Sequence, residues 1–227
     1  KRWGQNFLQD PNIIRKIVAQ LDPQPHDVVI EIGPGQGALT FELAKQVQTV
    51  HAIEIDPLLI THLNEHVPKN VNIIHQDILD FDLSQFSNNV KIIGNLPYNI
   101  TSPIIFKFLN CTSWSKMVFM TQKEVAQRIT SIHGNKIYGR LSVMTQALSD
   151  VKLSFTVPKT VFFPQPDVTS AILTFEPINT TIPDIHHFSQ IVKQAFSQRR
   201  KILRNTLKSV FSVEELGEFS SKRAEEL

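Results

Sequence analysis

Short β-rich runs alternate with helical patterns through the first two thirds of this chain, and this alternation limits the possible folds most strongly. Residues 28–32, 49–53 and 71–75 are runs rich in branched apolar residues, and helical patterns over 38–47 and 57–66 separate them. Such β-α-β-α-β order predicts a parallel sheet, because crossover helices return each strand in the same direction. The alternation continues with strands at 90–94 and 116–121 and helices near 102–110, 123–132 and 141–149.

Both ends of the chain depart from this order. Asp10-Pro11 precedes apolar residues at helical spacing, as an N-cap and a first-turn proline do, so we expect an opening helix. The last two strands, 151–157 and 170–175, are joined by a proline-bearing loop, which predicts an antiparallel hairpin ending a mixed seven-strand sheet. Only helical patterns follow. We therefore predict a Rossmann-like α/β domain over residues 1–178 and a small all-α domain over 179–227.

Charge is distributed unevenly along the 227 residues, although the formal net charge is only +2. Residues 22–82 hold ten acids and two lysines, whereas residues 83–213 hold fifteen Lys and Arg and five acids. No acid lies between 185 and 213, and such a basic stripe attracts polyanions. The alternative is an ordinary solvated helix face. The candidate RNA-binding residues are Arg199, Arg200, Lys201 and Arg204.

Composition narrows the setting in which the chain works. No apolar run approaches the roughly 18 to 20 residues of a bilayer span, so we expect no membrane segment. The single cysteine, Cys111, permits no internal disulfide and fits a reducing compartment. We expect a cytoplasmic monomer. The sequence begins at Lys1 and not at Met, so we also expect the natural chain to begin earlier.

Three glycines mark the point where the first strand of the alternation leads into a helix. In Glu31-Ile-Gly33-Pro-Gly35-Gln-Gly37, glycine lets the backbone approach a ligand, although a tight turn alone also uses glycine. Glu54 closes the next strand, where a carboxylate accepts hydrogen bonds from both hydroxyls of a ribose. The Gly-x-Gly-x-Gly spacing differs from the one that a dinucleotide's pyrophosphate favours. S-adenosylmethionine is therefore favoured over NAD.

Two further motifs follow strands at the same edge of the predicted sheet. Asn95-Leu96-Pro97-Tyr98 follows the strand at 90–94, and open α/β sheets bind ligands at the carboxyl ends of strands. A turn with an Asx hydrogen bond is the structural alternative. Asp77 ends the third strand, where it can accept a hydrogen bond from the amino group of a cofactor adenine or simply cap a helix.

Taken in order, these motifs resemble the adenine-N6 dimethyltransferases of ribosomal RNA over essentially the whole chain. The resemblance is carried by Gln5-Asn6-Phe7-Leu8, residues 31–37, Glu54, Asp77, residues 95–98, and Phe162-Phe-Pro164-Gln-Pro166-Asp-Val168-Thr-Ser170. Two further segments are more similar to the small-subunit enzymes than to the large-subunit antibiotic-resistance enzymes: Tyr138-Gly-Arg-Leu-Ser-Val-Met144 and Gln198-Arg-Arg-Lys-Ile-Leu-Arg-Asn205.

The resemblance implies an enzyme that dimethylates adenine N6 in small-subunit ribosomal RNA, at two adjacent adenosines near the 3′ end, within the assembling subunit. The implied catalytic motif is Asn95, Leu96, Pro97 and Tyr98. The Asn95 amide oxygen and a backbone carbonyl near Leu96 would accept both N6 hydrogens and free the nitrogen lone pair. Tyr98 would stack on an adenine flipped out of its helix. The implied second aromatic is Phe162, which we prefer to Phe163 on the Phe-x-Pro-x-Pro spacing.

The resemblance also implies a set of residues that bind S-adenosylmethionine. The N-terminal segment of this set would fold over the methionine end of the cofactor, and the remainder lies at predicted strand ends. The set is Gln5, Asn6, Leu8, Glu31, Gly33, Gly35, Gly37, Glu54, Ile55, Asp77, Ile78 and Asn95.

Other functions stay open from the sequence. A large-subunit rRNA methyltransferase shares the cofactor and target motifs. A non-catalytic ribosome assembly factor is disfavoured by the intact Asn95 and Tyr98, and a small-molecule NAD enzyme by the glycine spacing. His62-Leu-Asn-Glu65-His66 matches the inverted zinc-protease pattern, but no downstream ligand accompanies it, so we expect no metal site.

Overall fold

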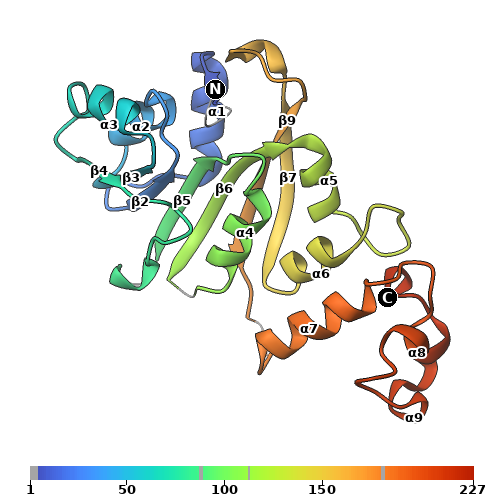
Figure 1. The fold of residues 1–227 in the computed structure, drawn as a ribbon. Helices are drawn as coiled ribbons and strands as arrows, with labels where there is room; N and C mark the ends of the chain where they lie inside the picture. Colours follow the sequence, from blue (N-terminus) through green and yellow to red (C-terminus); the bar gives the residue numbers. More distant parts are fainter. Residues whose placement is uncertain (1–4, 87–88, 112, 180–181) are drawn as a thin grey trace. The chain divides into compact units, whose positions relative to one another are not determined.

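The computed structural model describes residues 5–86, 89–111, 113–179 and 182–227 (Figure 1). The chain divides into two compact units: residues 1–126 with 150–177, and residues 127–149 with 178–227. The first unit contains the sheet, and the second is helical. From the sequence alone, 127–149 fall in the sheet domain, but their contacts place them with the C-terminal helices. The predicted single boundary near residue 178 is therefore wrong for residues 127–149, because the second unit is built from two separate segments of the chain.

Seven strands form the main sheet of the first unit (Figure 1). They are β2 (Val28–Ile32), β3 (Thr49–Glu54), β4 (Val71–His75), β5 (Val90–Asn95), β6 (Trp114–Gln122), β7 (Ser149–Val157) and β9 (Ser170–Pro177). Their order is β4-β3-β2-β5-β6-β9-β7. The β4-β3-β2-β5-β6 pairs are parallel, and β9 is antiparallel to β6. The prediction of a mixed seven-strand sheet with a parallel core is confirmed.

The order of the strands creates a switch point between β2 and β5. After β2 the chain adds β3 and β4 on one side, and it then returns to add β5 and β6 on the other. Helices that leave two neighbouring strands in opposite directions open a crevice at the carboxyl ends of those strands, where α/β sheets bind ligands.

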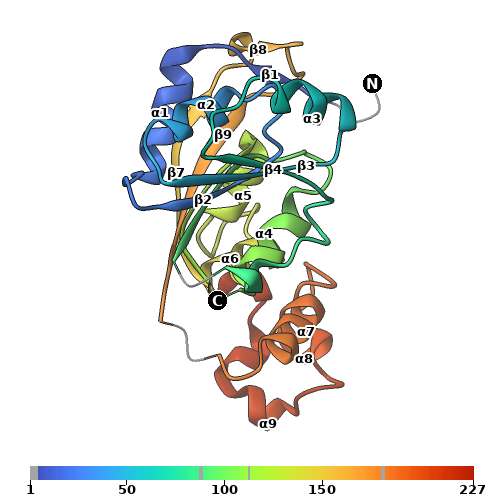
Figure 2. The ribbon, with the colours of Figure 1, turned by 90° about the vertical axis from the view of Figure 1, so that its left-hand side faces the viewer.

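Helices cover both faces of this sheet. Alternate residues of β6 face opposite ways: Val118 and Met120 belong to the buried cluster that includes Ile17, whereas the ring of Phe119 lies 6.4 Å from that of Phe108. Figure 2 accordingly shows α1 and α4 on opposite sides of the sheet. The helices of this unit are α1 (Pro11–Leu21), α2 (Ala38–Ala44), α3 (Pro57–Asn64) and α4 (Thr101–Leu109), and α5 (Lys123–Ile129) crosses into the second unit.

The opening helix begins as predicted. Asp10 is its N-cap, and the side chain accepts hydrogen bonds from the backbone N–H of Asn12 at 2.8 Å and of Ile13 at 3.3 Å. Pro11 occupies the first turn, where its missing N–H costs nothing. Short 3-10 helices, Leu83–Gln85 and Lys159–Val161, lie in the connections of this unit.

A two-stranded ribbon that the sequence pattern does not predict joins distant parts of the first unit. β1 (Phe7–Leu8) pairs antiparallel with β8 (Phe162–Phe163), so that Phe7 lies opposite Phe163 and Leu8 opposite Phe162. Two residues per strand are too few to show an alternation. The ribbon brings the N-terminal segment next to the proline-rich segment.

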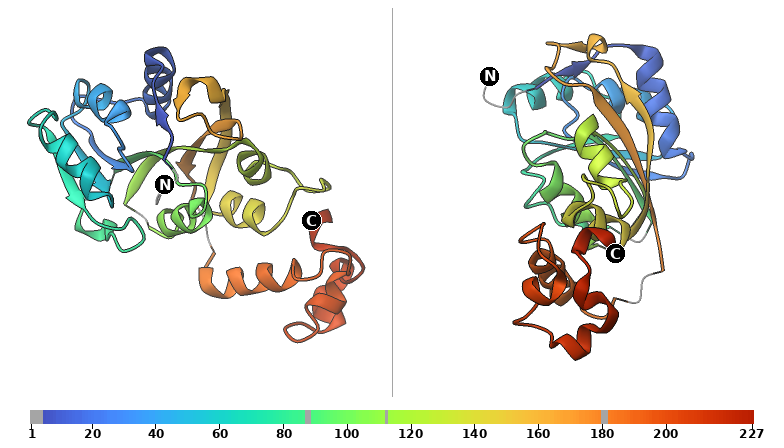
Figure 3. Two further views of the ribbon diagram at one scale, coloured as in Figure 1. Left: turned by 45° about the horizontal axis from the view of Figure 1, so that its top comes forward. Right: turned by 90° about the vertical axis from the view of Figure 1, so that its right-hand side faces the viewer.

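The second unit is all helical, as predicted for the C-terminal part. It contains α6 (Arg140–Gln146), α7 (Ile185–Ala195), α8 (Leu203–Thr206) and α9 (Val213–Leu216), with 3-10 helices Gly217–Ser221 and Ala224–Glu226. Asp184 caps α7 by accepting from His187 N–H at 2.9 Å. The helices after residue 184, orange to red in Figure 3, surround a small core of Ala195, Leu203, Leu207, Leu216 and Ala224. Within the described ranges, no helix is long and apolar enough to cross a membrane.

Candidate active site

A cavity of about 660 Å³ lies in the first unit at the carboxyl ends of the central strands. This volume falls within the range of about 300 to 1,000 Å³ that is typical of small-molecule sites. Most of the predicted site residues line it, and the structure therefore brings together segments that are widely separated in sequence. Those residues are Gln5, Asn6, Leu8, Glu31, Gly33, Gly35, Glu54, Ile55, Asp77, Ile78, Asn95, Leu96, Pro97 and Tyr98.

Gly37 is an exception among the predicted cofactor residues, because it does not line the cavity. It precedes α2 with a φ of 89°, a left-handed conformation that favours glycine. A Cβ atom at this position would lie 2.5 Å from a ring carbon of Phe41. The turn and the packing against Phe41 account for the third glycine of the motif, and its contact with a cofactor stays a prediction.

Phe162 is the second exception. Its side chain is only 5% exposed and belongs to the buried cluster with Leu8 and Ile172, whereas Phe163 is 66% exposed. Neither residue lines the cavity. Motif spacing distinguishes the two phenylalanines by position but not by the face of the ribbon that each occupies. In this structure, the preferred ring presents no face to the cavity.

The first two glycines of the motif form the floor of the cavity. Gly33 and Gly35 have φ angles of 63° and 61°, and Gly33 N–H donates to the Ile53 carbonyl at 3.0 Å. A Cβ on Gly35 would lie 3.2 Å from the Phe7 ring. Phe7 therefore covers the glycine turn closely, and it also lines the cavity. No role is predicted for Phe7 from the sequence, because its position at the cavity depends on the pairing of β1 with β8.

Glu54 presents a fixed carboxylate at the end of β3. Its side chain is 5% exposed, and Oε1 accepts from Ile55 N–H at 2.9 Å and from Asp56 N–H at 3.0 Å. Oε2 accepts from Gly35 N–H at 3.3 Å. Each carboxylate oxygen has two acceptor positions, so Oε2 keeps a position for a further donor. A ribose hydroxyl matches this requirement.

Glu31 is the least satisfied polar group of the site. It is 1% exposed, and its Oε2 atom has no hydrogen-bond partner in the described structure, nor has Oγ1 of the buried Thr40 nearby. Burial, together with the negative charge of Glu54, raises the pKa of Glu31 to about 7. A buried carboxylate oxygen without a partner is costly unless a ligand supplies a donor or a positive charge. The amino group of a methionine moiety fits this need.

Asp77 and Gln5 shape the rim of the cavity. Oδ1 of Asp77 accepts from Leu79 N–H at 2.8 Å, which fixes a turn and leaves the other oxygen available as an acceptor. Gln5 Nε2 donates to Oδ2 of Asp56 at 3.2 Å. The N-terminal segment is thereby attached to the turn that follows Glu54.

Four hydrogen bonds hold the tetrapeptide that begins at the last residue of β5. Asn95 Nδ2 donates to the Asn6 carbonyl at 3.3 Å, so its amide oxygen is the acceptor left for a substrate. The Leu96 N–H donates to the Met120 carbonyl at 3.0 Å, and the Pro97 carbonyl accepts from Thr101 Oγ1 at 3.0 Å. The Tyr98 hydroxyl forms a 2.8 Å hydrogen bond with Oγ of the buried Ser170. This motif is a rigid element in the cavity wall.

The predicted RNA-binding residues lie in the second unit, and all four are exposed. Arg199 differs from the others because its Nε donates to Glu225 Oε2 at 2.6 Å, forming an ion pair. Within the described part of the chain, the side chains of Arg200, Lys201 and Arg204 form no ion pair. Their role in RNA binding stays a prediction.

The two histidines of the zinc-protease pattern lie on α3 and just after its end. Nδ1 of His66 lies 2.7 Å from the carbonyl oxygen of His62, one turn earlier, and the two rings are 4.7 Å apart. The described residues contain no cluster of three or more His, Cys, Asp or Glu side chains that could hold a metal ion.

Two solved structures that match nearly the whole chain are a dimethyladenosine transferase and an rRNA methyltransferase. A dimethyladenosine transferase from Plasmodium falciparum superposes with a TM-score of 0.85 and 25% identity, over 97% of this chain and 92% of that one. A 23S rRNA methyltransferase, ErmE, gives a TM-score of 0.74 and 25% identity, over 97% and 96% of the two chains. Fold and site together define a Rossmann-like methyltransferase.

The family follows from the sequence comparison. The model of the ribosomal RNA adenine dimethylases matches residues 1–226, and this chain belongs to that family. A Ribosomal RNA small subunit methyltransferase A from Francisella tularensis subsp. novicida is 48% identical over 221 residues, covering 92% of this chain and 84% of the relative. Relatives from other F. tularensis subspecies, which bear the same name, are 47% identical. The family resemblance inferred from the motifs is confirmed.

Proposed function

We propose that this protein transfers methyl groups from S-adenosylmethionine to N6 of adenine in small-subunit ribosomal RNA, twice per adenine. The observation that carries the proposal is the position of Asn95 and Tyr98 in the wall of the same cavity as Glu54 and Glu31. A nucleoside-binding carboxylate and an amide suited to an exocyclic amine thus face one space. The name of the 48% identical relative supports the small subunit as the substrate.

The residues of the cavity fit the cofactor group by group. Glu54 would accept a ribose hydroxyl, and Asp77 and Ile78 would contact the adenine. Gly33 and Gly35 would allow close approach of the backbone, and the unpaired Oε2 of Glu31 would face the methionine end. When bound, S-adenosylmethionine supplies an electrophilic methyl group attached to a sulfonium.

Asn95 prepares the amine for attack. The lone pair of adenine N6 is delocalised into the purine ring, so the nitrogen is a poor nucleophile. Because Asn95 Nδ2 is already bound to the Asn6 carbonyl, its Oδ1 can accept one N6 hydrogen and draw the nitrogen toward tetrahedral geometry. Acceptance of hydrogen bonds, and not removal of a proton by a strong base, is the assistance this site offers.

Tyr98 provides a surface for the flipped base. Its hydroxyl is fixed by Ser170, so the ring is held in one orientation in the cavity wall. Stacking on such a ring contributes about 1 to 3 kcal/mol per base. A base held against Tyr98 with its amine at Asn95 is oriented for transfer, and orientation alone removes a large part of the entropic barrier.

RNA would be the partner of the second unit. Arg200, Lys201 and Arg204 offer exposed positive charge for phosphate, as the sequence predicts for the basic stripe. We extend the proposal to an assembling small subunit as the substrate, to a monomer as the active form and to the cytoplasm as its location. A large-subunit substrate is the competing hypothesis, because ErmE shares the fold.

Cofactor binding tests the first half of the proposal. Isothermal titration of the protein with S-adenosylmethionine should give one site, whereas NAD should give no heat of binding. Glu54→Gln should weaken this binding by about tenfold or more, since a charged hydrogen-bond acceptor to the ribose is lost. Tight binding of NAD in place of S-adenosylmethionine would refute the proposal.

A further inference from the structure

We propose that residues 132–140 of the second unit form a contact surface for the RNA backbone, and that Arg199 holds this loop instead of binding phosphate itself. The inference rests on the proposed function, which makes RNA the substrate. No RNA contact is predicted for this loop from the sequence, because it ends more than forty residues before the basic stripe begins. Only the division of the chain into units joins the two.

The loop exposes an unusual run of side chains. Every residue from 132 to 137 is exposed, and so is Arg140. Ile132 is 70% exposed and Ile137 43%, so both offer apolar surface beside the positive charges. The surrounding segment, 127–149, contains Arg128, Lys136 and Arg140 but no Asp or Glu. The loop is therefore both basic and apolar.

The backbone of this exposed loop is nevertheless fixed. Gly134 N–H donates to the Glu225 carbonyl at 2.7 Å, which attaches the loop to the C-terminal 3-10 helix. Within the loop, Asn135 accepts from Tyr138 N–H at 3.1 Å through its carbonyl and from Ile137 N–H at 3.1 Å through Oδ1. A loop that is ordered before binding loses less entropy when it meets a partner.

Arg199 makes two hydrogen bonds to the loop and one to Glu225. Besides the ion pair with Glu225, its Nη2 donates to the carbonyls of Asn135 at 3.5 Å and Tyr138 at 3.3 Å. The charge of Arg199 is thus compensated and most of its donors are in use. Its neighbours Arg200 and Lys201 have no such contacts among the described residues. Arg199 therefore joins the loop to the basic stripe.

The chemistry of the combined surface favours RNA as the occupant. Lys136 extends the stripe of unpaired positive charge, which suits phosphates along a strand. Ile132 and Ile137 offer apolar contact to sugar or base edges between those phosphates. An acidic or purely apolar protein partner would match only one of these two properties.

The salt dependence of RNA binding tests the loop. We would measure the affinity of the full chain for unmethylated small-subunit RNA by fluorescence anisotropy over a range of salt concentrations. Lys136→Gln should weaken binding and reduce the magnitude of the salt slope by about 1, because one phosphate contact is lost. Ile132→Ser with Ile137→Ser should weaken binding without changing the slope. Lys69→Gln, an exposed lysine of the first unit, is the matched control and should change neither.

The role of Arg199 needs a readout besides affinity. Arg199→Gln should speed hydrogen exchange at the amides of Gly134 and Tyr138, and adding Lys136→Gln should weaken RNA binding little further. Unchanged exchange with additive losses of affinity would show that Arg199 binds phosphate directly and would overturn its assigned role. Arg200→Gln is the control, with an altered salt slope but unaltered exchange.

The experiments distinguish failure of the loop proposal from failure of the proposed function. If the wild-type chain methylates small-subunit RNA but Lys136→Gln keeps the wild-type affinity and slope, only the loop proposal is wrong. If the wild-type chain transfers no methyl group to RNA, the proposed function fails and the loop proposal with it.

Discussion

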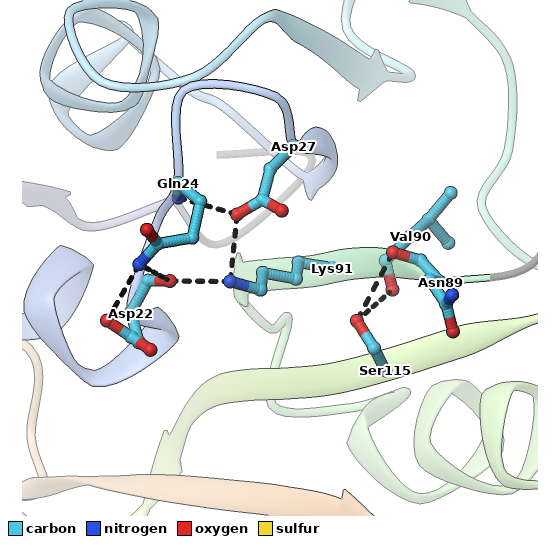
Figure 4. A network of polar contacts seen from close by, with 7 residues as sticks. All are labelled: Asp22, Gln24, Asp27, Asn89, Val90, Lys91 and Ser115. Atoms are coloured by element: carbon cyan, nitrogen blue, oxygen red, sulfur yellow. Dashed lines mark hydrogen bonds and ion pairs between the residues drawn. The ribbon is translucent and has the colours of Figure 1, made fainter.

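Charged and polar residues are paired with one another at the amino ends of the central strands β2 and β5, but they are left partly unpaired at the carboxyl ends. At the amino end, Lys91 of β5 forms an ion pair with Asp27 at 2.8 Å and also donates to the Asp22 carbonyl. Asp27 accepts from Gln24 N–H at 2.7 Å through the same oxygen. Figure 4 shows this network converging on the Lys91 amine. The polar atoms of the network satisfy one another.

At the carboxyl end, the same two strands present Glu31, four residues after Asp27, and Asn95, four residues after Lys91. Among the residues that the structure describes, Oε2 of Glu31 has no partner, and the amide of Asn95 is bound through its nitrogen only. Burial without partners destabilises the folded chain, so a site of this kind costs stability. The comparison teaches that satisfied polar groups mark structure here and unsatisfied ones mark a ligand site. Substitutions at the two ends should therefore affect different properties.

The largest effect is expected at Asn95. Asn95→Ala should lower the rate of methyl transfer by about 10³-fold, because the acceptor for the target amine is lost at a site where such groups act in the transition state. The affinity for S-adenosylmethionine, measured by calorimetry, should stay within about threefold of wild type. A parallel loss of cofactor affinity would contradict the assignment of Asn95 to the target base.

The corresponding change at the amino end should affect stability instead. Lys91→Ala leaves Asp27 with its charge nearly buried, and removal of one partner of such a pair costs about 3 to 5 kcal/mol. Chemical denaturation should show this loss in the free energy of unfolding. Transfer per folded molecule should be unchanged. Reduced turnover at full stability would show that the two ends are not separated as we describe.

Glu31 should give the carboxyl end a pH dependence. Its pKa of about 7 in the folded chain lies above the ordinary value of 4.5, so the folded state binds the extra proton between these values. The free energy of unfolding should therefore fall as pH rises from about 4.5 to 7, by up to about 3 kcal/mol from this group. Glu31→Gln should remove that fall. Denaturation curves at pH 5 and pH 8 for both proteins provide the measurement.

The same group should make cofactor binding depend on pH. A cationic ligand beside Glu31 favours its charged form, so affinity for S-adenosylmethionine should rise with pH through about 7. Calorimetry at several pH values measures this trend. Glu31→Gln should bind more weakly, with a flat profile; an unchanged profile would place the charge of the ligand elsewhere.

The smallest effects are expected at the ribbon, where buried and exposed phenylalanines adjoin. Phe162→Leu should lower the free energy of unfolding by about 1 kcal/mol, because a core ring is lost, whereas Phe163→Leu should leave it unchanged. Both variants should also be assayed for transfer. Loss of transfer in Phe162→Leu, at concentrations and temperatures where it is fully folded, would restore the stacking role that the motif spacing predicts.

Long periodic segments could be predicted from the sequence, and short or non-local features could not. The strands β2, β3, β4 and β5 each coincide with a recognisable run, and the ends of β3 and β5 lead directly to Glu54 and Asn95. The ribbon of β1 and β8 has two residues per strand and depends on pairing across more than 150 positions. For that reason, the burial of Phe162 and the covering position of Phe7 are visible only in the structure.

Partners of charged residues are a second feature that sequence patterns do not determine. Arg199 reads as one member of a basic run, yet its contacts lie with Glu225 and with a loop sixty residues earlier. Likewise, the residue type of Glu31 predicts a polar contact, but only its burial shows that the contact is missing. Both differences arise because tertiary packing, not local order, decides which charges are compensated.

The most direct test is the identity of the methylated product. The protein would be incubated with labelled S-adenosylmethionine and, separately, with unmethylated small ribosomal subunits and large-subunit RNA, and the nucleosides identified by mass. We predict N6,N6-dimethyladenosine in the small-subunit sample, absent for Asn95→Ala. Label confined to large-subunit RNA, or binding of the subunit without any transfer, would contradict the account.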